Sequence, residues 1–269
     1  MEFPTGLGTS DATTIRLLGH NLAEELIGQV GFGELALWLA TQKRPTPNQV
    51  RMFEAVQVSL ADHGFTPIAI AARMTLYSAP DALQGALAAG LLGGGSRFLG
   101  VTEDTGRFLA GVLAKVDGPL PNISEEWDEL ARQAVKEQRA AGKFVPGLGH
   151  PVHKNVDPRT AVIFELAEKE NLRGPHLRLF EAIGRVHGEI LSRKLPLNGA
   201  GVAGAALADI GLAPELLRGV ALLARAAGLL GHLAEEMRNP IAPAIYAAVD
   251  RNAVYRPLSE TEDEEETNQ

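Results

Sequence analysis

The chain has 269 residues, no cysteine and a formal net charge of -8 at pH 7. The absence of cysteine excludes disulfides, thiolate metal sites and a cysteine nucleophile. Six acidic residues fall within the last ten positions, so the rest of the chain is close to neutral. These six are Glu260, Glu262, Asp263, Glu264, Glu265 and Glu266. We expect residues 259–269 to form a disordered acidic tail.

A near-neutral body lacks the basic face that nucleic-acid binding requires. The start MEFPTGLGTSD has no basic segment followed by an apolar run, so we expect no secretory signal and a cytoplasmic protein. Two apolar stretches, ALQGALAAGLLGGG and VALLARAAGLLGHLAEEM, are interrupted by Gly, Arg225 or His232. A membrane span needs roughly 18 apolar residues, so we expect both stretches to be buried core helices and no membrane partner.

The first half of the chain predicts one short strand and then helices. Residues 14–18 could form a hairpin strand. The tetrapeptide TPNQ at residues 46–49 has the form of a capping box, which predicts a helix from there through Leu60. Ser78, followed by a proline and an aspartate, predicts the start of a further helix that ends in the glycines at 93–95.

The second half predicts helices alone. Ser124 precedes three acidic residues and begins an amphipathic helix. Asp157 and Pro158 have the residue types of an N-cap and a first helical position. Further helices are expected at residues 176–193 and 214–237, from apolar residues at helical spacing. We therefore predict an all-α fold with one short strand near its start.

Two proline-containing breaks predict a division into lobes. The first is Gly118-Pro119-Leu120-Pro121, and the second lies near Leu195-Pro196. We expect residues 1–118 and 196–258 to form a large helical domain that also mediates dimerisation. Residues 119–195 would form a small lobe that carries the turn around His150.

The segment VPGLGHPVHKNVDPR, residues 145–159, has the residue types of a site for an acidic substrate. Its glycines let the backbone approach a ligand, His150 can exchange a proton near neutral pH, and Arg159 can grip a carboxylate with two parallel donors. The alternative is a helix C-cap glycine followed by a structural histidine. The polar run that continues to Arg159 favours the site.

Three other features leave alternatives. His150 and His153 have the spacing of a metal pair, but no HExxH-like context is present, and we expect no metal. His63 follows an apolar helix as either a C-cap residue or a functional group. Arg225 is an isolated cation in an apolar helix, and its partner could be a structural carboxylate or a substrate anion.

The segment Gly199 to Gly204 matches GxGxxG, the dinucleotide-binding pattern. That pattern requires a preceding buried strand, whereas here it follows SRKLPLN, which is short, charged and contains a proline. Small residues that allow close packing of helices are the favoured explanation.

Four segments, taken in order, resemble citrate synthase: residues 18–47, 61–73, 145–159 and 222–236. ADHG followed by GLLGGGSRFLG, residues 90–100, is more closely similar to the citryl-CoA lyase domain of ATP-citrate lyase and its free-standing relatives. The resemblance covers almost the whole chain. It implies a citrate synthase-like helical fold, a homodimer or higher homo-oligomer, and coenzyme A bound as an acyl-CoA together with a small carboxylic acid.

The resemblance also implies roles for individual residues. His150 would act on the oxaloacetate carbonyl or the citryl hydroxyl. His63, which we count as catalytic as well, would bind the polar ends of the substrate with Arg159 and Arg225. The coenzyme A positions would be Val145, Pro146, Gly147, Leu148, Gly149 and Asn198.

Two positions depart from the citrate synthase pattern. Gly93 stands where that enzyme has a histidine, and the lyase-like relatives also lack this histidine. Ala200 stands where the NVDG motif carries the aspartate that removes a proton from the acyl-CoA methyl group. A positioned base contributes a factor of roughly 10² to 10⁴ in rate, so we expect formation of the carbon–carbon bond to be slowed by about this factor.

Cleavage needs a base at the substrate hydroxyl instead, a task within reach of His150. We therefore expect a citryl-CoA lyase-like carbon–carbon lyase that releases acetyl-CoA and a 2-oxo acid such as oxaloacetate. Glu103, Asp104 or Glu235 could replace the missing carboxylate. The alternative is a non-catalytic CoA-binding pseudoenzyme or regulatory subunit. ATP use is not expected, because the chain has no phosphate-binding loop.

Overall fold

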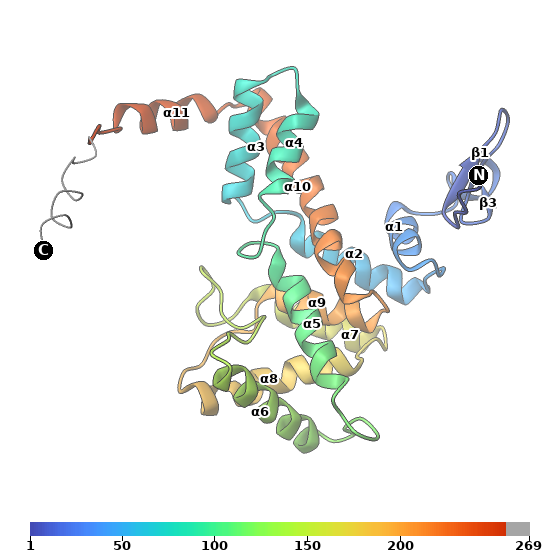
Figure 1. The fold of residues 1–269 in the computed structure, drawn as a ribbon, viewed down its shortest axis with the longest axis vertical. Helices are drawn as coiled ribbons and strands as arrows, with labels where there is room; N and C mark the ends of the chain where they lie inside the picture. Colours follow the sequence, from blue (N-terminus) through green and yellow to red (C-terminus); the bar gives the residue numbers. More distant parts are fainter. Residues whose placement is uncertain (257–269) are drawn as a thin grey trace, which may run out of the picture.

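The computed structural model describes residues 1–256 (Figure 1). The predicted acidic tail, residues 259–269, and the last two residues of the predicted large domain lie outside the described residues. Within them the fold is mostly helical, which confirms the predicted all-α class.

The chain begins with a small antiparallel sheet of order β1-β2-β3. Its strands are β1 (Gly8–Ser10), β2 (Ile15–Leu17) and β3 (His20–Asn21), with Thr9 opposite Arg16 and Leu17 opposite His20. β2 confirms the strand predicted near residues 14–18. A π-helix, η1 (Leu22–Leu26), and helix α1 (Phe32–Thr41) lead from the sheet into the body of the molecule (Figure 1).

The remaining elements are helices. They are α2 (Pro47–Ala61), α3 (Pro67–Ser78), α4 (Leu83–Leu92), α5 (Gly100–Leu113), α6 (Ser124–Ala140), α7 (Pro158–Lys169), α8 (Pro175–Leu191), α9 (Gly199–Asp209), the 3₁₀ turn η2 (Pro214–Leu216), α10 (Leu217–Arg238) and α11 (Ala242–Arg251).

The predicted helix starts agree with the structure at most positions. Thr46 and the residue three positions on form the full capping box at the start of α2, and Asp157 caps α7. The prediction at Ser78 was wrong. Ser78 is the last residue of α3, because the next backbone N–H still bonds to the Thr75 carbonyl, and α4 begins only at Leu83.

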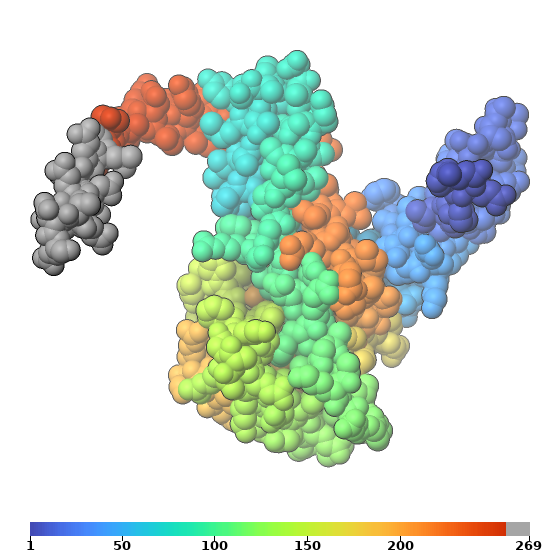
Figure 2. Space-filling model, viewed as in Figure 1, coloured from blue at the N-terminus to red at the C-terminus, as the bar shows by residue number. Residues whose placement is uncertain are grey.

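Two hydrophobic cores hold the helices together. The larger one lies among α2 and α5 to α10 and includes Phe53, Trp127, Ile183 and Val202. The smaller one lies between α3, α4 and α10. The larger core joins residues from both predicted lobes, and the proposed division at 118 and 196 stays a prediction. The N-terminal sheet and α11 project from this body (Figure 2).

Helix α10 is central to the fold and contacts α2, α3, α4 and α5. With η2 it forms the one described segment, Pro214–Arg238, whose length and hydropathy would suffice to cross a membrane; 44% of its apolar window is buried. A core helix passes the same test, and the contacts with four other helices indicate that role.

The GxGxxG segment forms the first turns of α9 and follows no sheet strand among the described residues. A side chain at Gly204 would collide with the backbone carbonyl of Thr102 on α5. The small residues therefore let α5 and α9 approach backbone to backbone, as predicted.

Candidate active site

A cavity of about 790 Å³ lies between the loop after α2, the turn before α7, the start of α5, the start of α9 and one face of α10. Every site residue predicted from the sequence lines it. They are His63, Val145, Pro146, Gly147, Leu148, Gly149, His150, Arg159, Asn198 and Arg225. The segments that supply them are far apart in the chain, so the fold alone brings these groups together.

The glycine turn is fixed by Asn198, the N-cap of α9. Gly147 and Gly149 have φ angles of +82° and +83°, which L side chains rarely adopt. The Asn198 amide Nδ2 donates to the Gly149 carbonyl at 2.7 Å, and its Oδ1 accepts from the Gly201 N–H at 2.8 Å. The Asn198 side chain thus joins the turn to α9, in addition to lining the cavity.

Replacing Gly147 by alanine is expected to lower the free energy of unfolding by about 2–5 kcal/mol. The left-handed φ costs a non-glycine residue about 1–2 kcal/mol, and overpacking adds about 1–3 kcal/mol. A Cβ there would lie 2.5 Å from Phe180 and 3.1 Å from the Thr105 hydroxyl. Chemical denaturation measures the loss.

Gly142→Ala is the matched control, because Gly142 has a φ of +68° and nothing within 4 Å of a built Cβ. It should lose only the conformational part, about 1–2 kcal/mol. Equal losses at the two positions would show that close packing does not constrain residue 147.

Hydrogen bonds fix the tautomer of His150. Its Nδ1 accepts from the backbone N–H groups of Val152 at 3.1 Å and His153 at 3.0 Å. The neutral ring therefore carries its proton on Nε2. Burial, followed by the neighbouring His153, lowers the pKa of His150 below its ordinary value. His150 thus presents a neutral N–H donor, which differs from our expectation that it accepts the hydroxyl proton.

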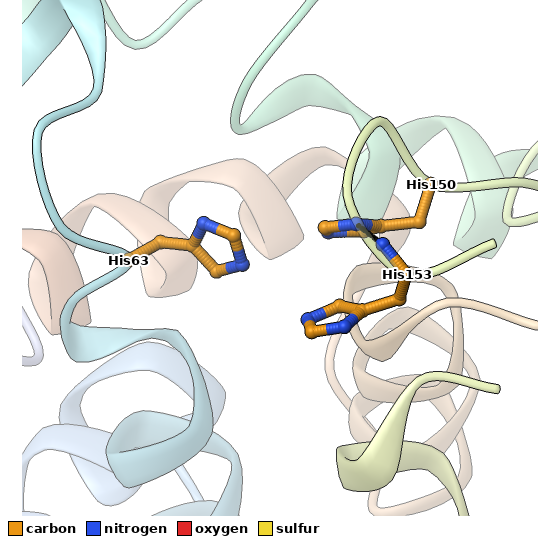
Figure 3. Close-up of side chains that lie close together, drawn as sticks. All are labelled: His63, His150 and His153. Atoms are coloured by element: carbon orange, nitrogen blue, oxygen red, sulfur yellow. Dashed lines mark hydrogen bonds between the residues drawn. The ribbon is translucent and has the colours of Figure 1, made fainter.

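Two further imidazoles surround His150 (Figure 3). The ring centroid of His63, from the loop after α2, lies 5.2 Å from that of His150, and His153 lies 4.5 Å from His150. Burial, then the charges of Arg159 and Arg225, lower the pKa of His63. His63 is therefore neutral at pH 7, and it is free to accept a proton. His153 was outside the predicted site; the HxxH spacing was its only signal in the sequence.

The three histidines have nitrogen atoms within 4.8 Å of one another, a spacing that metal ligands also show. Coordination through Nε2 of His150 would require a proton on Nδ1, which faces two N–H donors. The cationic Arg159 and Arg225 also oppose a bound cation. The arrangement of donors therefore does not fit a metal ion, and the expected absence of a metal stays a prediction.

Arg225 is a buried cation with unused donors. Only 5% of the residue is exposed, and its Nε and Nη1 have no hydrogen-bond partner among the described residues. The nearest carboxylate oxygen, Oδ1 of Asp62, is 3.9 Å from Nη1. Burial lowers the pKa of Arg225, although a guanidinium remains charged at neutral pH. Of the two partners left open by the sequence, this geometry favours an anion in the cavity.

Arg159 uses part of its guanidinium group to bind Asp157. Its Nε and Nη2 donate to the two oxygens of Asp157 at 3.0 and 2.7 Å, and Nη1 donates to the Ser59 carbonyl at 3.3 Å. Burial alone would raise the pKa of Asp157, but Arg159 and the Gly199 N–H hold that pKa well below its usual range. Asp157 is therefore a fixed anion that orients Arg159, and it is not a base.

A hydrogen-bonded network positions the loop that carries His63, and no sequence pattern predicts it. The buried Arg73 donates from Nη1 to Glu236 at 2.9 Å and from Nε to Nδ1 of His232 at 3.1 Å. The Nε2–H of His232 then donates to Asp62 at 2.9 Å. Asp62 directly precedes His63, so the network fixes the base of that loop.

Ala200, the second residue of α9, also lines the cavity. Of the three carboxylates named as replacements for the missing aspartate, Glu235 pairs with Arg73, and Glu103 pairs with Arg107 and Arg218. Neither lines the cavity, whereas Asp104 does.

Comparison with known proteins finds relatives that match most of the chain. The family model described as citrate synthase, C-terminal domain, matches residues 13–256. Citrate synthase of Deinococcus radiodurans is 29% identical over 203 residues, which are 71% of this chain and 48% of that protein. A probable ATP-citrate synthase of Caenorhabditis elegans is 28% identical over 259 residues, 88% of this chain and 22% of that protein. The chain thus spans less than half the length of these relatives.

Among solved structures, citryl-CoA lyase from Hydrogenobacter thermophilus is similar over 99% of both chains, with a TM-score of 0.83 and 29% identity. ATP citrate lyase from Methanothrix soehngenii, solved with citrate and coenzyme A, shares the fold with a TM-score of 0.76 and 21% identity, over 97% of this chain and 42% of that one. With the family model matched from residue 13 to residue 256, the chain belongs to the citrate synthase family.

Proposed function

We propose that the chain is a carbon–carbon lyase that cleaves a 3-hydroxyacyl-CoA such as citryl-CoA to acetyl-CoA and a 2-oxo acid such as oxaloacetate. One observation carries the proposal: the Nε2–H donor of His150, the neutral His63 and Arg225, with two nitrogens that have no hydrogen-bond partner among the described residues, share one cavity. The similarity to citryl-CoA lyase over the full length of both chains supports the same activity.

The groups divide the work of cleavage between them. Arg225, with the remaining donors of Arg159, binds the carboxylates of the acid portion. His63 takes the hydroxyl proton as the carbon–carbon bond breaks and the hydroxyl-bearing carbon becomes a carbonyl. The Nε2–H of His150 donates to that oxygen, where negative charge develops, and so stabilises the transition state. The electron pair of the broken bond passes into the enolate of the acetyl thioester.

His150→Ala is expected to slow release of acetyl-CoA from citryl-CoA by about 10²-fold, the usual cost of removing one donor to a developing oxyanion. Chromatography of the thioesters measures the rate. His20→Ala is the control, because His20 pairs with Glu25 in the N-terminal sheet outside the cavity. Its rate should match that of the parent.

A parent protein that binds coenzyme A tightly but does not cleave citryl-CoA would contradict the lyase. It would support instead the non-catalytic CoA-binding role, for which the absence of a carboxylate at Ala200 is the specific observation.

A further inference from the structure

The lyase reaction leaves a carbanion equivalent that needs a proton. When the carbon–carbon bond breaks, the acetyl thioester is released as an enolate, and its methylene carbon must gain a proton to give the methyl group. Because His63 holds the hydroxyl proton and His150 is a hydrogen-bond donor to oxygen, a different group has to serve this carbon. We propose that Asp104 donates this proton to the enolate carbon and removes it in the reverse direction. The inference rests on the proposed function.

Among the described residues, Asp104 is the one acidic side chain that lines the cavity. Two carboxylates that adjoin cavity-lining residues already have hydrogen-bond partners. Asp157 accepts from Arg159 and the Gly199 N–H, and Asp62 accepts from His232 and the Gly64 N–H. Within residues 1–256 the Asp104 side chain makes no hydrogen bond or ion pair, so its oxygens are free to take and return a proton.

The packing of α5 against α9 brings the start of α5 beside the glycine turn and the start of α9. Thr105, the next residue, has its hydroxyl 3.1 Å from the position of a Cβ built on Gly147. The Cα of Gly147 is in turn 2.6 Å from a Cβ built on Gly201, which follows Ala200. Asp104 and Ala200 thus lie on two helices in direct contact beside the glycine turn, and both face the same cavity.

With Asp104 in this role, every proton transferred in one turnover has a donor and an acceptor. In the cleavage direction, His63 returns to solvent the proton that it took from the substrate hydroxyl, and solvent delivers a proton to the exposed carboxylate of Asp104. Asp104 passes this proton to the enolate carbon, the electron pair of the enolate forms the new C–H bond, and acetyl-CoA results. Asp104 and His63 both return to their starting states, and the hydroxyl hydrogen that the substrate loses equals the hydrogen that the methyl group gains. In the reverse direction, the carboxylate removes a proton from the thioester methyl group.

The test follows this step separately from cleavage. The full chain is incubated with acetyl-CoA and oxaloacetate in D₂O, and deuterium in the methyl group is measured by mass spectrometry. Asp104→Asn should slow the exchange by about 10²-fold, within the range for a positioned base. Glu103→Gln, one position earlier on α5 and outside the cavity, should exchange within about 2-fold of the parent. Affinity for coenzyme A, measured by calorimetry, should be unchanged in both variants.

The outcomes separate the two proposals. If the parent cleaves citryl-CoA but Asp104→Asn exchanges deuterium at the parent rate, the assignment of Asp104 is overturned and the lyase stands. If the parent neither cleaves nor exchanges, the proposed function is overturned and the assignment falls with it. Slow exchange in Asp104→Asn, with normal exchange in Glu103→Gln, supports both.

Discussion

Arg225→Met is expected to lower kcat/KM for citryl-CoA cleavage by about 10³-fold while leaving the free protein at least as stable as the parent. Two charge-assisted hydrogen bonds to a carboxylate contribute about 1.5–3 kcal/mol each, which corresponds to a loss of about 10² to 10⁴. The free protein gains little from this cation, because two of its nitrogens have no hydrogen-bond partner among the described residues and its contact with the half-exposed Asp62 is long, at 3.9 Å. Steady-state kinetics and thermal unfolding measure the two effects.

The stability expectation follows from the cost of burying a charge. An unpaired ion inside a protein loses its hydration, and an apolar side chain of similar volume does not. Methionine keeps most of the volume of arginine, so it fills the same space on α10. Loss of activity without loss of stability is the expected behaviour of a residue whose partner arrives with the substrate.

Arg73→Met is the matched control, because Arg73 is a second buried arginine and its donors are paired. It bonds to Glu236, Glu235 and His232, and it is fully buried. Its removal leaves the buried carboxylate of Glu236 without its cation, which typically costs about 3–5 kcal/mol. If Arg225→Met lost stability to the same extent, Arg225 would be a structural ion-pair partner and not an anion receptor.

The comparison of these two arginines shows what a sequence can and cannot predict. Arg225 stands out as an isolated cation in an apolar helix, but the choice between a structural and a substrate partner depends on which helices pack against it. No local pattern marks Arg73 as a network residue, because its partners lie about 160 positions further along the chain. A local sequence pattern can identify a buried cation such as Arg225, whereas its hydrogen-bond and ion-pair partners are known only from the tertiary structure.

Local signals predicted most of the helix starts and the glycine turn. The capping box at Thr46, the cap at Asp157 and the glycine turn before His150 are encoded within a few residues, and all three appear as expected. The start of α4 was wrong, because α3 extends through the serine chosen as its cap. A residue type that favours caps cannot reveal how far the preceding helix continues.

The chemistry of His150 depends on details that no sequence pattern reports. Its tautomer is set by two backbone N–H groups of its own turn, and its charge state by burial. The choice among Glu103, Asp104 and Glu235 likewise depends on helix rotation, since adjacent residues on α5 point in different directions. The structure places Asp104 in the cavity and Glu103 in ion pairs outside it.

Ala200→Asp, made in the Asp104→Asn background, is expected to raise the rate of deuterium exchange into acetyl-CoA by about 10³-fold. A positioned base contributes roughly 10² to 10⁴ to proton abstraction, and residue 200 lines the cavity beside the glycine turn. An aspartate in the first turn of α9 also interacts favourably with the helix dipole, by about 0.3–1 kcal/mol. The variant should therefore fold, and mass spectrometry of the acetyl-CoA measures the gain.

Ala200→Asn in the same background separates the base from the change in side-chain size, because asparagine has nearly the same shape but cannot take the proton at neutral pH. It should show no gain. A folded Ala200→Asp variant that binds coenzyme A but exchanges no faster would mean that residue 200 does not face the reacting carbon. A gain with aspartate alone would show that the rest of the site, from His150 to Arg225, is assembled for acyl-CoA chemistry and that its rate depends on where one carboxylate stands.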